Sequence, residues 1–123
     1  MKKIPTYYFC IDGGGTKSIA NLYDYNNNII SSSKTDSGNI FNDVYKVERN
    51  IDKLWSNCCK KAKLNKNFIC QYTIASFGLA GARSTKHKKL IKKKFNFFKK
   101  IIISTDGYIA LAGTSMNKSM AVI

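Results

Sequence analysis

The stretch YYFCIDGGGTK, from Tyr7 to Lys17, sets the architecture of this chain. Its first five residues form a continuous apolar run that stops at an aspartate and three glycines, as expected for a central strand buried on both faces. Residues 18–25 alternate imperfectly between apolar and polar side chains, which predicts a second strand joined to the first by a hairpin through the glycines. A turn at 26–28 and a third strand at 29–34 would close an antiparallel meander.

The sequence then switches to helical periodicity. Apolar side chains from Val44 to Cys58 recur every three or four residues, which predicts an amphipathic helix capped by Asn42 or Asp43. A fourth strand is expected at residues 72–77, where a short apolar run ends at a glycine. The chain therefore returns to the sheet directly after its first helix.

Beyond the fourth strand, helix and strand alternate. A second helix is expected to start at Ser84 or Thr85 and to carry Ile91, Phe95 and Phe98 on one face. The remaining expected elements are a fifth strand at 101–103, a third helix from about Tyr108 and the opening of another strand at 119–123.

This order of elements predicts an α/β domain. We expect a five-stranded mixed sheet in which the first three strands are antiparallel, the fourth and fifth run parallel to the first, and helices cover both faces. Nearly all glycines lie at the expected carboxyl ends of strands, namely at 13–15, 38, 78, 81 and 107. Ligands bind at that edge in open α/β sheets, so the glycines indicate a cleft there.

Composition limits the classes of protein that the chain can belong to. Its 123 residues suffice for one domain, and no apolar run approaches the ~20 residues of a membrane span. The net charge of +14 permits contact with nucleic acid or membrane. However, the lysines at 86–94 are most simply the solvated face of a helix, so we expect neither partner. The four cysteines lack C-x-x-C spacing, which indicates reduced thiols in the cytoplasm, with one of Cys58 and Cys59 packed and the other at the surface.

The glycine loop has the chemistry of a phosphate site. Consecutive glycines expose several backbone N–H groups to an anion, Thr16 adds a hydroxyl, Lys17 adds a charge and Asp12 can hold a water-shelled Mg²⁺. The alternative is a plain glycine hairpin turn. We favour phosphate binding because of the flanking aspartate and threonine, which gives a candidate site made of Asp12, Gly13, Gly14, Gly15, Thr16 and Lys17.

A strand that ends in this loop and hairpins into a second strand resembles the first phosphate loop of the superfamily of actin, heat-shock chaperones and sugar kinases. Within it, the chain is most similar to the BadF/BadG/BcrA/BcrD-type ATPases, a branch that includes N-acetylglucosamine kinase. The matching segments are 12–17, 37–39, 78–81 and 104–107, the last followed by Ala110. The resemblance implies a ribonuclease-H-like fold and the use of ATP and Mg²⁺.

The same resemblance assigns roles to single residues. Asp106 matches the catalytic aspartate, which would accept the proton of the sugar hydroxyl, although it could serve only as a helix cap. Asn39 matches a residue that binds the amino sugar, although it could be a turn residue. Gly78 and Gly81 match the glycine-rich end of the fourth strand, beside the substrate.

The resemblance also implies what the chain contains and what it lacks. Residues 1–123 match the N-terminal half of an amino-sugar kinase, with 119–123 at the start of a second domain that would supply a further phosphate loop and the adenosine site. We therefore expect the chain alone to be inactive, and we expect a small sugar substrate and a homodimer in the full-length enzyme. The alternatives are an ATPase activator of the 2-hydroxyacyl-CoA dehydratase or benzoyl-CoA reductase type, or a non-catalytic remnant.

Overall fold

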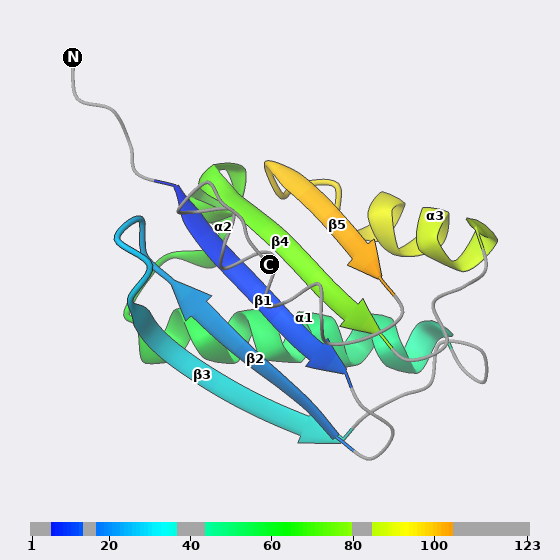
Figure 1. The fold of residues 1–123 in the computed structure, drawn as a ribbon, viewed down its shortest axis with the longest axis horizontal. Coiled ribbons are helices and arrows are strands. Elements are labelled where there is room, and N and C mark those ends of the chain that lie inside the picture. Colours follow the sequence, from blue (N-terminus) through cyan, green and yellow to red (C-terminus); the bar gives the residue numbers. More distant parts are fainter. Residues whose placement is uncertain (1–5, 14–16, 37–43, 80–84, 105–123) are drawn as a thin grey trace.

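Five strands form one mixed sheet in the computed structural model of the chain (Figure 1). The structure describes residues 6–13, 17–36, 44–79 and 85–104. The order of the strands across the sheet is β3-β2-β1-β4-β5. The strands are β1 (Tyr7–Gly13), β2 (Lys17–Tyr23), β3 (Ile29–Asp36), β4 (Thr73–Leu79) and β5 (Lys100–Ser104).

The predicted order and directions of the strands are confirmed. β1 pairs antiparallel with β2, and β2 pairs antiparallel with β3, so the meander is present. β4 runs parallel to β1, and β5 runs parallel to β4, which leaves β1 as the central strand. Between β2 and β3, the carboxylate of Asp24 accepts hydrogen bonds from the backbone N–H groups of Asn26 and Asn28, both at 2.9 Å. Asn27 takes the positive φ of 68° that asparagine tolerates in such a turn.

The helix α1 (Val44–Lys61) follows the predicted apolar stripe and packs against β2 and β3. Ser31 and Ser33 of β3 are buried where α1 packs on the sheet, and their small side chains allow the helix to approach closely. The Ser31 hydroxyl donates to the Cys58 carbonyl at 2.7 Å, and the Lys61 ammonium donates to the Ser32 carbonyl at 2.7 Å. The last turns of α1 are therefore tied to the edge strand.

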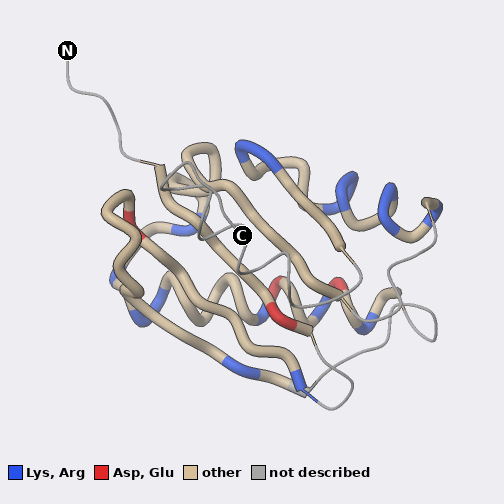
Figure 2. Tube along the Cα trace, viewed as in Figure 1, with Lys and Arg blue, Asp and Glu red and all other residues tan. Residues whose placement is uncertain are grey.

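The helix α3 (Thr85–Lys94) carries lysines along its exposed side, as Figure 2 shows. It contacts α1, and the buried side chains of both helices belong to one core. The predicted helix from about Tyr108 lies outside the described residues, as do the strand opening at 119–123 and the caps Asn42, Asp43 and Ser84. No helix in the described part of the chain is long and apolar enough to cross a membrane.

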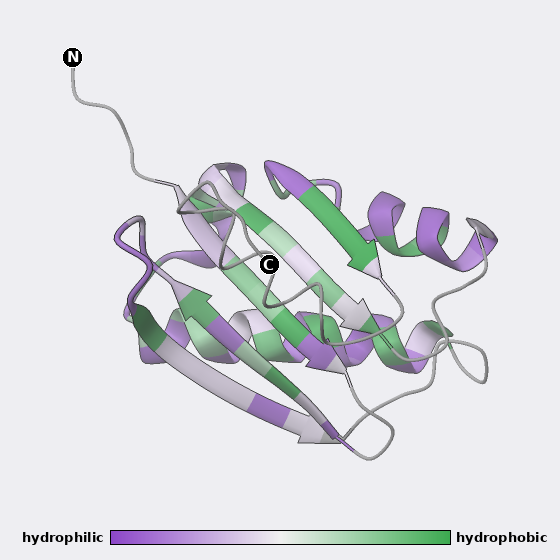
Figure 3. Ribbon diagram, in the orientation of Figure 1, coloured by the Kyte–Doolittle hydropathy of each residue, from purple (hydrophilic) through white to green (hydrophobic). Residues whose placement is uncertain are grey.

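An aromatic cluster fills the space between the sheet and the helices, where Figure 3 shows hydrophobic residues on β1 and β4. The Phe9 ring lies 4.9 Å from the Trp55 ring, and Trp55 lies 4.9 Å from Phe98, measured between ring centroids. Phe77 and Phe95 meet edge-to-face at 6.1 Å. These contacts join β1, β4, α1 and the segment that precedes β5.

Two features differ from the predictions. The second helix ends at Lys94, so Phe95 and Phe98 lie in the turn that follows it and not on its face. Both are nonetheless buried, because the turn points them at the sheet. In addition, a short helix α2 (Lys66–Ile69) and a 3-10 turn η1 (Cys70–Tyr72) lie between α1 and β4, where no helix was predicted.

Candidate phosphate-binding site

The carboxyl ends of the three parallel strands meet at one edge of the sheet. Asp12 of β1 is directly opposite Gly78 of β4, and Gly78 is directly opposite Ser104 of β5. Neighbouring strands lie about 4.8 Å apart, so the Cα atoms of Asp12 and Ser104 are separated by about 10 Å across the sheet. The strand ends therefore converge as the sequence predicted.

Gly13 is held in place by the close approach of β4. A Cβ atom at this position would lie 3.0 Å from the Gly78 carbonyl oxygen, 3.3 Å from Leu79 Cδ2 and 3.3 Å from Ser18 Oγ. No side chain fits into that space without moving the neighbouring strand. Packing inside the sheet thus favours glycine at the first position of the loop, whatever the loop binds.

Asp12 and Lys17 flank the glycine loop of the hairpin, and both side chains are exposed. Asp12 is the last side chain of β1 before the glycines, and Lys17 opens β2. Within the described residues, no three His, Cys, Asp or Glu side chains gather in a way that could hold a metal ion. A lone carboxylate of this kind suits Mg²⁺, which keeps several waters and is held by one or two carboxylates together with substrate phosphates.

Several predicted site residues lie outside the described residues. They are Gly14, Gly15, Thr16, Asn39, Gly81 and Asp106. Of the predicted site, the structure places Asp12, Gly13, Lys17 and Gly78, and it brings Asp12 and Gly78 side by side. In the sequence, Asp106 comes two residues after Ser104, the last residue of β5.

The structure also contains two hollows that the sequence did not indicate. One, of about 250 Å³, lies between α1, α2 and Phe97. The other, of about 480 Å³, runs along α3 and is lined by Lys86, Lys89 and Lys93 with Thr85 and Leu90. Phe97, which lines the first hollow, had no predicted role in the core or at a site.

Curated relatives match only part of the chain. The glycerol kinases of Renibacterium salmoninarum and Paenarthrobacter aurescens are each 31% identical to it over 81 residues. These residues make up 64% of this chain and 16% of each relative, so the chain matches about a sixth of the length of these kinases.

Solved structures share the fold. A protein from Chromobacterium violaceum, assigned as an N-acetylglucosamine kinase, superimposes with a TM-score of 0.73 at 17% identity, over 84% of this chain and 36% of that one. A weaker likeness, with a TM-score of 0.46 at 15% identity, is to component A of (R)-2-hydroxyglutaryl-CoA dehydratase from Acidaminococcus fermentans, over 80% of this chain and 30% of that one.

The family assignment rests on a match over most of the sequence. The family model covers residues 10–123, which include the hairpin glycines and every strand from β2 to β5. The matched fold is the ribonuclease-H-like α/β sheet expected from the sequence. The chain belongs to the BadF/BadG/BcrA/BcrD ATPase family.

Proposed function

We propose that this chain is the N-terminal part of an ATP-dependent kinase that phosphorylates a hydroxyl group of an amino sugar such as N-acetylglucosamine. The observation that carries the proposal is the register at the sheet edge, where Asp12, Gly78 and Ser104 are aligned across three neighbouring strands. Phosphoryl transfer depends mainly on positioning and electrostatics, so a nucleotide loop and an acceptor site must share one edge.

The roles of the residues follow from their chemistry. The backbone of Gly13, Gly14 and Gly15 would face the phosphates, with the Thr16 hydroxyl and the Lys17 ammonium beside them. Asp106 would act as the general base that takes the proton of the acceptor hydroxyl. For this role it must lie within hydrogen-bond reach of the bound sugar.

Other residues would shape the pocket of the sugar. Asn39 would contact its polar groups. Gly78 and Gly81 leave the acceptor side of the cleft free of side chains.

Asp12 fits a Mg²⁺ ion that arrives with the nucleotide. Its carboxylate is exposed at the end of β1, where it could reach the water shell of such an ion. Mg²⁺ bound in this way would neutralise charge on the phosphates. Asp12 would hold it through its water shell.

An alcohol acceptor is supported by the names of the similar proteins. The glycerol kinases and the N-acetylglucosamine kinase are both named for substrates that carry hydroxyl groups. The four cysteines are buried and form no disulfide bond in the described residues, which suits a protein that works in a reducing compartment such as the cytoplasm. Catalysis would require a second domain, as the resemblance to amino-sugar kinases implies, and the complete enzyme would act on one small sugar at a time.

Nucleotide binding by the chain tests the first half of the proposal. We expect titration calorimetry to detect Mg²⁺-dependent binding of ATP, and we expect Asp12→Asn to remove the effect of Mg²⁺ while ATP alone binds as before. Asp24→Asn, in the distant turn between β2 and β3, is the matched control and should leave both values unchanged. Absence of any ATP binding would contradict the phosphate-loop assignment.

Substitution of Asp106 tests the second part of the proposal, which is phosphoryl transfer to a sugar hydroxyl. In a fusion of residues 1–123 to the second domain of an active relative, Asp106→Asn should lower kcat by about 10²–10⁴ and leave ATP binding unchanged. Asparagine still accepts the hydrogen bond of a helix cap but takes up no proton. A variant that keeps its kcat and melts at a lower temperature would show that Asp106 is only a cap.

A further inference from the structure

A pocket of about 250 Å³ opens at the end of the sheet opposite to the glycine loop. Two of its lining residues, Asn67 and Cys70, come shortly before the start of β4, and Phe97 comes shortly before the start of β5. The backbone N–H of Lys99 donates to the Thr73 carbonyl at 2.9 Å, which ties these two strand starts together. The pocket therefore lies far along the strands from Asp12.

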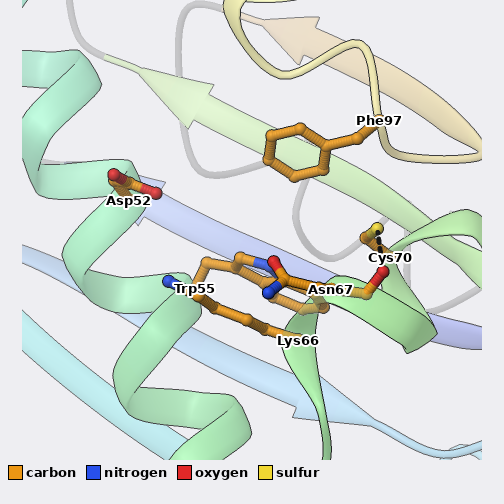
Figure 4. A pocket seen from close by; sticks show the side chains of 6 residues that line it. All are labelled: Asp52, Trp55, Lys66, Asn67, Cys70 and Phe97. Carbon is orange, nitrogen blue, oxygen red and sulfur yellow. Dashed lines mark hydrogen bonds between the residues drawn. The ribbon is translucent and has the colours of Figure 1, made fainter.

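The walls of the pocket are aromatic. Figure 4 shows the Phe97 ring on one side and the Trp55 indole with Asn67 on the other. Trp55 is only 2% exposed, whereas Phe97 is 40% exposed although its ring lies 4.8 Å from that of Phe98. A flat apolar group placed between these walls would cover Phe97 and extend the aromatic cluster of the core.

Opposite charges stand side by side at the rim. The Lys66 ammonium donates to the Ser56 hydroxyl at 2.7 Å, which holds the lysine head group against α1. Ser56 lies one helical turn after Asp52, so their Cβ atoms are about 5–6 Å apart. Within the described residues, no hydrogen bond or ion pair engages the Asp52 carboxylate. A carboxylate and an ammonium are thus available next to each other without neutralising each other.

We propose that this pocket binds a free aromatic α-amino acid. The ring would enter between Phe97 and Trp55, the α-ammonium would donate to Asp52, and the α-carboxylate would accept from Lys66. An α-amino acid carries its two charges on neighbouring atoms, as the rim requires, and the charge-assisted hydrogen bonds would fix its orientation. Because the zwitterion has no net charge, the +14 charge of the protein neither attracts nor repels it.

The tryptophan of the chain makes this proposal directly testable. Trp55 is the one tryptophan in the sequence, so its fluorescence reports on the pocket. We expect L-phenylalanine to change the fluorescence of the full chain saturably, with a Kd of roughly 0.05–5 mM for a ligand of this size. Three probes that each lack one feature serve as comparisons: 2-phenylethylamine, 3-phenylpropionate and L-alanine. Each should bind ~10-fold or more weakly than phenylalanine.

Variants distinguish a specific amino-acid site from a groove that binds any apolar ring. Asp52→Asn should weaken phenylalanine binding ~10-fold or more but leave 3-phenylpropionate unaffected, since that probe has no ammonium group. Glu48→Gln, one turn earlier on α1, is the control for lost charge and should bind as the parent chain does. Phe97→Ala should lose binding, while Phe68→Ala, which removes an exposed ring that does not line the pocket, should not.

Melting curves of each variant, with and without phenylalanine, keep loss of binding distinct from loss of folding. A folded Phe97→Ala chain is expected to melt at the same temperature with and without the amino acid, whereas the parent chain should melt at a higher temperature when phenylalanine is added. Three outcomes would overturn the proposal: equal binding of L-phenylalanine, 2-phenylethylamine and 3-phenylpropionate, unchanged phenylalanine binding in Asp52→Asn, or no saturable signal up to ~10 mM. Asp52 and Phe97 would then be ordinary solvent-exposed side chains.

Discussion

Gly13 lies where an added Cβ atom would meet the backbone of the neighbouring strand. Its backbone faces the Gly78 carbonyl of the neighbouring parallel strand, and that contact is made by backbone and not by a side chain that could turn aside. The sheet therefore favours glycine at this position.

Replacement of Gly13 by alanine should destabilise the fold. The new Cβ would lie 3.0 Å from the Gly78 oxygen, which forces β1 and β4 apart, and overpacking of this kind costs about 1–3 kcal/mol. Urea unfolding followed by circular dichroism measures the change. Lys34→Ala, at an exposed position of the edge strand, should change the free energy of unfolding by less than about 0.5 kcal/mol. Equal values for the two variants would contradict the packing argument.

Cys58 and Cys59 are both buried, although the sequence predicted that one of them would be a surface thiol. Cys58 lies on the apolar stripe of α1 and contacts the Ala20 carbonyl at 3.9 Å. Cys59 lies off that stripe, but α2 packs against α1, and the charge of Lys66 acts on the Cys59 thiol. Burial first, and the neighbouring Cys58 second, raise the pKa of Cys59 to about 12, while Lys66 opposes the rise.

This raised pKa predicts a loss of stability at alkaline pH. The unfolded chain releases the Cys59 proton near the ordinary value of 9.0, whereas the folded chain keeps it until about pH 12. Stability is therefore complete below about pH 9 and falls as the pH rises further, by at most about 1.4 kcal/mol per pH unit for this thiol. Urea unfolding from pH 8 to 10.5 should show a shallower fall for Cys59→Ala than for the parent chain. Identical slopes would mean that the thiol titrates normally in the folded chain.

At the scale of elements, α3 stands out because its charges repel one another. Residues 53–105 contain 14 Lys and Arg and no Asp or Glu, while the rest of the chain contains seven of each kind, so the whole net charge lies in this stretch. Lys86 lies three residues before Lys89, and Lys92 and Lys93 lie three and four residues after it, so their charges are close on the helix surface. The first turn of α3 holds no acidic residue. The helix is held by burial of Ile91 and by the contacts of Phe95.

A single charge reversal should therefore stabilise α3. Lys86→Glu places an acid in the first turn, where it complements the helix dipole, and three residues before Lys89, where it replaces repulsion by attraction. We expect a gain of about 0.5–1.5 kcal/mol at low salt that fades toward 1 M salt. Lys94→Glu makes the same charge change at the other end of α3, where the dipole disfavours an acid, and should bring no such gain. If both variants were stabilised equally, net charge and not helix position would be the cause.

At the scale of the whole molecule, the chain corresponds to only part of the kinases that it resembles. It covers 36% of the solved kinase that it resembles in fold. Phosphoryl transfer requires that water be excluded and that both substrates be held, so we expect the purified 123-residue chain to turn over N-acetylglucosamine far below the ~1–100 s⁻¹ usual for kinases. A coupled assay of ADP release measures this. Turnover in the usual range would show that one domain suffices.

Much of this architecture was predictable from local patterns in the sequence. The apolar run before the glycines marked β1 as the central strand, and the three-to-four residue period marked α1, because strand and helix periods follow from backbone geometry. The glycines at strand ends predicted where the parallel strands converge, and the pairing of Asp12 with Gly78 agrees. For Asp106, Asn39 and Gly81 the sequence remains the source of the prediction.

Other features depended on contacts between residues far apart in the chain. The end of α3 at Lys94 follows from the turn that buries Phe98 against Phe9 and Trp55, and no local period encodes that contact. Asn65 caps α2 by accepting from the N–H groups of Asn67 and Phe68, a signal too short to be distinguished from a loop. The position of α2 relative to α1 decides whether Cys59 is buried. The positions of α2 and Phe97 decide whether a pocket opens beside Trp55. Such positions are set by packing between elements, because a side chain's burial depends on its neighbours in space and not on its neighbours in sequence.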